Sequence, residues 1–139
     1  MNIENQVLGL IRLSGYLKEF LSKKSEDYND NDADFEILLK KSEIENPWFT
    51  MENHKFALQQ WADLLTEENI KDWLREYTVS KTSKRVGLIL AGNIPLVGLH
   101  DVISVVLSNH IPVIKLSSKD RNMIPFLLKK WNEFSEGNV

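Results

Sequence analysis

The sequence predicts an α/β fold, with a helical region over residues 1–80 and a strand–helix–strand–helix unit over residues 81–139. In the first region, apolar residues recur at the spacing of amphipathic helices. In the second, two short apolar runs flank a helical segment, as in parallel strands joined by a crossover helix. A polar segment of Lys, Ser and Thr over residues 80–84 separates the two patterns and marks the expected boundary between the regions.

The helical region is expected to contain four short helices, each with an apolar stripe. Two threonines are expected N-caps, because each precedes a helical run with acidic residues in its first turn. Pro47 ends the second helix, since proline disfavours helical geometry in the residue before it. An acidic segment over residues 25–32 is expected to be a loop. The expected helices cover residues 4–23 and 34–44 and follow the caps Thr50 and Thr66.

The first apolar run of the second region, residues 85–91, does not alternate with polar residues, as expected of a strand buried on both faces of a parallel sheet. The elements expected after it are a turn at 92–95, a helix at 96–109, a strand at 111–116, a turn and cap at 117–120 and a helix from Met123 to Phe134. Two parallel strands leave both sheet edges unpaired. We therefore expect the remainder of a longer polypeptide, or self-association with another chain, to complete the sheet.

Composition excludes several classes of protein. The 17 basic and 20 acidic residues are interspersed and give a net charge of −3, which argues against nucleic-acid binding, because phosphate neutralisation needs clustered Lys and Arg. The absence of cysteine excludes disulfides, Cys-ligated zinc and a thiol nucleophile within these residues. His54 and His110 are far apart and form no metal-ligand pattern. With no signal peptide and no apolar stretch long enough for a membrane span, the expected location is cytoplasmic.

Two positions at the expected strand ends are candidates for ligand contacts. Ligands bind beyond the carboxyl ends of parallel strands, where the amide of Asn93 could donate to a developing oxyanion. The alternative is that Asn93 only satisfies turn geometry. Lys115, followed by Ser117 and Ser118, could reach a ribose or phosphate, or could simply extend from the sheet rim into water.

Three other groups have structural explanations. His100 and Asp101 do not form a catalytic triad with Ser104, because adjacent residues on a helix do not face each other. Trp48 and Phe49 are expected to pack the helical region onto the sheet, since buried aromatic side chains are usually core residues. The helices that contain Trp61 and Trp73 are expected to form the inner face of a small bundle.

Three segments resemble a known family. Residues 46–50 (NPWFT), with the two tryptophan helices that follow, resemble the N-terminal region of bacterial acyl-CoA reductases, relatives of the fatty acyl reductase that supplies aldehyde to bacterial luciferase. Residues 86–101 are similar to the Asn-aromatic-Pro segment of the aldehyde dehydrogenase superfamily, with Ile94 in the aromatic position. Residues 113–120 resemble that superfamily's Val-Leu-Lys-Pro-Ser-Glu strand. The resemblance covers nearly the whole chain.

The resemblance implies an incomplete aldehyde-dehydrogenase-like fold, a helical layer followed by the first βαβα portion of a dinucleotide-binding sheet. It implies an NADPH-dependent oxidoreductase that reduces a cysteine-bound fatty acyl group, delivered as acyl-CoA, to a fatty aldehyde. Asn93 would belong to the oxyanion hole, and Lys115, Ser117 and Ser118 would bind the cofactor. Ser118 stands where NAD-preferring relatives often carry glutamate, which favours NADPH, because serine does not repel the ribose 2′-phosphate.

This chain contains no cysteine, so we expect it to be inactive alone, as a fragment whose catalytic cysteine lies beyond Val139. Two alternatives remain open. The chain could be a non-catalytic α/β domain that acts as a protein-interaction module through its aromatic helices. It could also be a module that binds a nucleotide weakly without catalysis.

Overall fold

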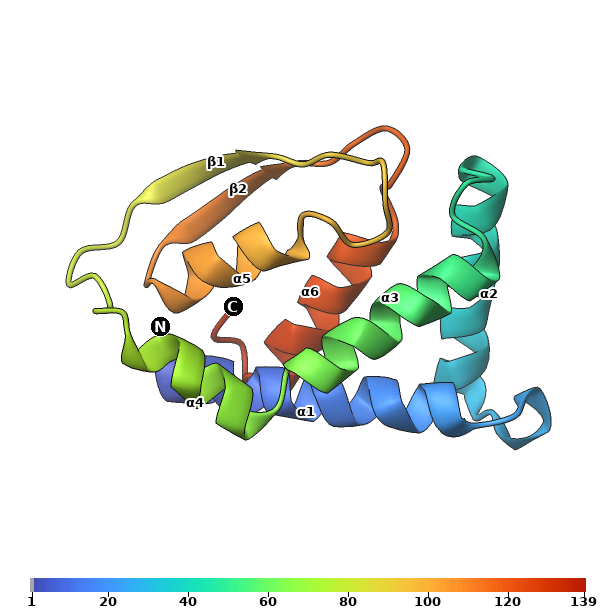
Figure 1. Cartoon of the computed structure of the whole chain (residues 1–139), viewed down its shortest axis with the longest axis horizontal. Coiled ribbons are helices and arrows are strands. Elements are labelled where there is room, and N and C mark those ends of the chain that lie inside the picture. Colours follow the sequence, from blue (N-terminus) through green and yellow to red (C-terminus); the bar gives the residue numbers. More distant parts are fainter. Residues whose placement is uncertain (1) are drawn as a thin grey trace.

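The computed structural model describes residues 2–139, which form a mostly helical structure, 60% helix, with a small two-stranded parallel sheet, and so a broadly α/β fold. Figure 1 shows the sheet as one outer layer, α5 and α6 beneath it, and α1 on the far side from the sheet. The elements are α1 (Ile3–Ser22), the 3-10 helix η1 (Ser25–Asp27), α2 (Asp30–Glu45), α3 (Met51–Leu64), α4 (Glu67–Arg75), β1 (Arg85–Ile89), α5 (Leu99–Leu107), β2 (Ile111–Lys115) and α6 (Met123–Phe134).

The helices of the first region begin at side-chain caps. Thr50 and Thr66 accept hydrogen bonds from the backbone N–H groups of Asn53 and Asn69, so both expected caps are confirmed. The expected loop over residues 25–32 is wrong in its last part. The helix α2 begins four residues earlier than expected, because Asn29 and Asp32 form a reciprocal capping box.

The sheet pairs β1 with β2 in parallel, with Gly87 opposite Val113 and Ile89 opposite Lys115. The expectation that β1 is buried on both faces is wrong. Burial alternates along both strands, and Ile89 on the outer face is 84% exposed. In Figure 1, the helices lie on one side of the sheet. The apolar run from residue 85 is therefore covered on one face only within the described residues.

The helix α5 begins three residues later than expected. Leu96 adopts a left-handed conformation with φ 61°, which an α-helix cannot include. The close packing of Gly98 on Leu90 fixes the next part of this segment, because a Cβ at Gly98 would lie 2.7 Å from a Leu90 methyl carbon. As a result, Asn93 lies on a long irregular connection rather than just before a helix.

One hydrophobic core joins the two regions. Gly9 of α1 lies against α6, where a side chain would overlap Ser135 Oγ. Trp131 of α6 is buried and donates its indole N–H to the Gln6 carbonyl at 2.8 Å. The chain ends also meet here, since the Asn2 backbone N–H donates to Asn138 Oδ1 at 3.0 Å.

Trp61 and Trp73 are half-buried and pack against this core, in keeping with the inner-face position expected for their helices. Within residues 2–139, no helix combines the length and the apolar character needed to cross a membrane. The same residues contain no group of three or more His, Cys, Asp or Glu side chains placed to hold a metal ion.

Candidate functional site

The loops that follow β1 and β2 lie against each other at the carboxyl ends of the strands. Gly92, in the first loop, approaches Ser117, in the second, so closely that a Cβ at position 92 would overlap the Ser117 hydroxyl. Glycine is therefore the residue that permits this contact. The contact places Asn93 beside the segment that contains Ser117 and Ser118.

Asn93 lies at the edge of a cleft of about 540 Å³ between α3 and the loop after β1. The side chain of Asn93 is exposed, and no hydrogen bond to it is found among the described residues. Aromatic residues form the facing wall, and Ile94 and Pro95 lie on the same side as Asn93. The facing wall includes Trp48, Phe49, Phe56 and Trp61. The cleft is therefore largely apolar, with the free amide of Asn93 at its rim.

The segment before α3 attaches the helical region to the loop after β2. Asn46 is buried and donates its side-chain amide to the Lys119 carbonyl at 3.2 Å. The Lys119 ammonium lies 5.7 Å from the centroid of the Trp48 ring, within cation–π range. Phe49 is buried as expected, but Trp48 is 73% exposed and lines the cleft. The expectation that both aromatics serve as packing is thus correct only for Phe49.

Asp120, in the loop after β2, has a buried carboxyl group. The sequence predicted that this residue belongs to a turn and cap. Asn122, not Asp120, occupies the N-cap position of α6. Burial raises the pKa of Asp120 to about 6, and the nearby backbone N–H of Leu96 opposes this rise only in part. Its Oδ1 has no partner within residues 2–139. The buried carboxyl group of Asp120 therefore lies near Leu96, three residues after Asn93.

One sequence signal was available for Asp120, which is its position in a loop at the carboxyl end of an expected parallel strand. Its burial could not be inferred, because it depends on the contact between two loops that are distant in sequence. Among the residues predicted to have a functional role, Asp120 was therefore missing.

The predicted cofactor residues are divided between two surfaces. Lys115 is exposed on the outer face of the sheet, opposite Ile89, and does not line the cleft. Ser117 is half-buried, and its hydroxyl accepts a hydrogen bond from the Lys119 N–H at 3.2 Å. Ser118 is exposed in the turn. The structure thus brings Asn93 close to Ser117 and leaves Lys115 on a different face.

The predicted absence of a triad around His100 is confirmed. His100 Nδ1 and Asp101 Oδ1 are 3.8 Å apart, beyond hydrogen-bonding distance. The Ser104 hydroxyl donates to the His100 carbonyl oxygen at 2.8 Å and not to the imidazole ring.

His54 is fully buried, and neither ring nitrogen has a hydrogen-bond partner within the described part of the chain. Burial lowers the pKa of His54, against the opposing effect of Glu43. Its ring packs edge-on against Phe49, with centroids 5.6 Å apart. These contacts indicate a packing role for His54.

Comparison with protein-family models, with curated proteins and with solved structures gives no match for this chain. The chemical role of the site therefore rests on the groups that these residues place there. These groups are the free amide of Asn93 at the rim of an apolar cleft, the exposed ammonium group of Lys115 at the end of β2, the hydroxyl groups of Ser117 and Ser118 in the loop that follows, and the buried carboxyl group of Asp120.

Proposed function

We propose that this chain supplies the N-terminal part of an NADPH-dependent acyl-CoA reductase, which reduces a cysteine-bound fatty acyl group to an aldehyde. The observation that carries the proposal is the contact of the two strand-end loops at Gly92 and Ser117, which places the free amide of Asn93 above an apolar cleft. The resemblance of both strand-end segments to the aldehyde dehydrogenase superfamily agrees with this arrangement.

In this proposal, Asn93 stabilises negative charge on the acyl oxygen. An amide N–H held at a fixed position can donate to an oxyanion as it forms, without reorganisation during the reaction. We assign Asp120 as a positioning residue, because its buried carboxyl group lies near the backbone of Leu96, in the segment that carries Asn93. The apolar cleft excludes water from the aliphatic part of the substrate.

The residues of the second strand fit the adenosine ribose and 2′-phosphate of NADPH. Lys115 is exposed and has no ion pair among the described residues, so its ammonium group is free to bind an oxygen of the cofactor. Ser118 can donate its hydroxyl to a phosphate oxygen, and no carboxylate side chain stands at that position to repel the anion. The bound cofactor would supply the hydride.

The nucleophile is not part of this chain, because the sequence contains no cysteine. The sequence must therefore continue, or another chain must contribute, for acyl transfer to a thiolate to occur. The exposed outer face of the sheet supports this requirement, since parallel sheets are normally covered on both faces.

The deciding experiment reads the gene beyond the codon for Val139 and assays the protein that it encodes. We expect a continuing reading frame with a cysteine, and oxidation of NADPH that depends on a fatty acyl-CoA. In that protein, Ser118→Glu should weaken the binding of NADPH by about 1–4 kcal/mol, because the new carboxylate repels the 2′-phosphate. The binding of NADH should be nearly unaffected. Equal effects on both cofactors would contradict the assignment of this strand, and a stop codon after Val139 would contradict the reductase proposal.

A second candidate is a protein-interaction module without catalytic activity. The exposure of Trp48 and Phe56 at the cleft favours it, because large exposed aromatic residues are typical of binding surfaces. Two results together would support this candidate over the reductase. The reading frame would end after Val139, and Trp48→Ala would abolish binding to a specific protein partner.

A further inference from the structure

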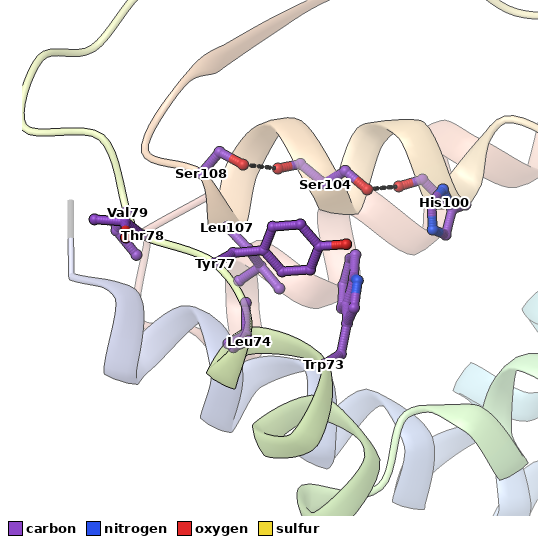
Figure 2. Close-up of a pocket in the computed structure, with 9 residues that line it drawn as sticks. All are labelled: Trp73, Leu74, Tyr77, Thr78, Val79, His100, Ser104, Leu107 and Ser108. Atoms are coloured by element: carbon purple, nitrogen blue, oxygen red, sulfur yellow. Dashed lines mark hydrogen bonds between the residues drawn. The ribbon is translucent and has the colours of Figure 1, made fainter.

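A second pocket, of about 250 Å³, lies between α4 and α5. Figure 2 shows Tyr77 extending from the end of α4 beneath Ser104, with Trp73 and His100 at one end of the pocket. No residue that lines it also lines the cleft beside Asn93. A cavity of about 150 Å³ can hold benzene, so this pocket has room for a compact group of several carbon atoms.

Three aromatic side chains give the pocket its character. The rings of Trp73 and His100 have centroids 5.6 Å apart and are tilted by 38°. Tyr77 is 66% exposed, so its ring is largely available to a ligand. The face of a Trp or Tyr ring carries partial negative charge and attracts cations more strongly than neutral groups of the same shape.

Two serine hydroxyls on α5 add acceptors to this surface. Ser104 donates its only hydroxyl proton to the His100 carbonyl at 2.8 Å, and Ser108 donates to the Ser104 carbonyl at 2.6 Å, as the dashed lines in Figure 2 mark. Because each proton is engaged within the helix, each oxygen offers lone pairs to the pocket. The hydroxyls therefore favour a ligand that donates hydrogen bonds.

The charges near the pocket point in the same direction. None of the described residues that line it is Lys or Arg. The lining therefore offers a bound anion no ion pair, whereas the ring faces of Trp73 and Tyr77 and the serine lone pairs favour a cation.

We propose that the pocket between α4 and α5 binds an organic ammonium cation with a small apolar body. The methyl or methylene groups of such a ligand contact Leu74 and Leu107, the positive charge lies against the rings of Trp73 and Tyr77, and a donor group on the ligand reaches a serine oxygen. This site is independent of the proposed reductase function, and its test does not depend on that function.

The test compares choline with its uncharged isostere, the alcohol in which a carbon atom replaces the ammonium nitrogen. Both have the same shape and the same hydroxyl group, so their difference reports the charge alone. The full chain is titrated with each at pH 8 and constant ionic strength, by calorimetry and by the NMR shift of the Trp73 indole N–H. We expect saturable choline binding that is about tenfold tighter than binding of the alcohol, or more.

Two variants locate the binding. Tyr77→Leu should lower the affinity for choline severalfold, because it removes an aromatic face from the pocket. The variant should remain folded, because Tyr77 is largely exposed. Phe56→Leu is the matched control, since Phe56 is also 66% exposed but lies in the other cleft, and it should leave choline affinity unchanged. Equal binding of choline and the alcohol, no saturable binding of choline, or equal losses in the two variants would each overturn the proposal.

Discussion

Helix α1 and the sheet differ in how completely they bury their apolar residues. In α1, Leu10, Leu13 and Leu17 are all buried, against helices from both regions. In the sheet, the inner face packs against the core, but Ile89 and Val113 on the outer face are exposed. An amphipathic helix needs one covered face, whereas a parallel strand has two. The difference shows that the apolar stripe of α1 is covered and that the sheet has a face that a further layer could cover.

The largest effect should come from Trp131, which connects the two regions. Trp131→Ala removes a buried indole ring from α6 and its hydrogen bond to the Gln6 carbonyl in α1. We expect a loss of about 3–5 kcal/mol in the free energy of unfolding. Urea denaturation followed by circular dichroism and by the fluorescence of the remaining tryptophans should give one coincident transition. Separate transitions would show that the two regions fold independently and would break the comparison.

Two aspartates, one in each region, should give opposite dependences of stability on pH. Burial raises the pKa of Asp120 to about 6 from 3.8, so the folded state retains a proton that the unfolded state has lost. The stability that this proton contributes is fully present below pH 3.8 and is lost as the pH rises through 6. Asp120→Asn should therefore stabilise the protein at pH 7 by up to about 3 kcal/mol and have little effect at pH 3.

Asp32 should behave in the opposite way. Burial opposes its ionisation, but Lys23 at 2.8 Å and the Asn29 N–H outweigh burial and lower the pKa of Asp32 below its usual value. The stability from this group is present above the unfolded pKa and is lost as the pH falls through the folded pKa, below 3.8. Asp32→Asn should cost about 1–3 kcal/mol at neutral pH and less in acid. Thermal unfolding of both variants across pH 3–8 checks the contrast, and parallel profiles would contradict it.

His54 should have a smaller effect within the helical region. Burial lowers its pKa, so protonation of the unfolded state removes stability as the pH falls below 6.5. Because both ring nitrogens lack partners within residues 2–139, His54→Leu should stabilise the chain by about 1 kcal/mol at pH 7 and by more at pH 5. Chemical denaturation at the two pH values measures this difference. A destabilised variant would indicate that the imidazole has a bonding partner.

The smallest effect should come from the outer face of the sheet. Ile89→Ser should change the stability of the monomer by less than about 0.5 kcal/mol, because Ile89 is 84% exposed. It should nevertheless reduce the self-association expected for this face, which light scattering at high concentration would detect. Ile114→Ala, on the covered face of the neighbouring strand, is the control and should destabilise the monomer. A wild-type chain that stays monomeric at high concentration would contradict the expected self-association.

Several interactions between residues close in sequence were predicted, although the capping box of Asn29 and Asp32 at the start of α2 was missed. Thr50 and Thr66 cap their helices through residues three positions away, and the pairs that form the sheet belong to two consecutive apolar runs. The late start of α5 was missed, because nothing in the type of residue at Leu96 signals its left-handed conformation. Local patterns thus predicted most elements but not the starts of α2 and α5.

The candidate site was predictable only in part. Asn93 and Ser117 follow strands, and the position alone indicated them. The separation of Lys115 from the cleft, the burial of Asp120 and the exposure of Trp48 depend on contacts between segments distant in sequence. The burial of β1 was also not predictable from its sequence. An apolar run that is covered on one face can have the same composition as a run that is covered on both faces.

The hydrogen bond between Asn2 and Asn138 makes this chain suitable for circular permutation. A short glycine-rich linker could join the two ends, and the exposed polar segment at residues 81–84 offers a place to reopen the backbone. The rearranged polypeptide would start with β1 and finish after α4, while α6 and α1 became consecutive through the linker. If that molecule folds, the order of synthesis of the two regions is irrelevant to their assembly, and the new ends would offer attachment points next to the sheet.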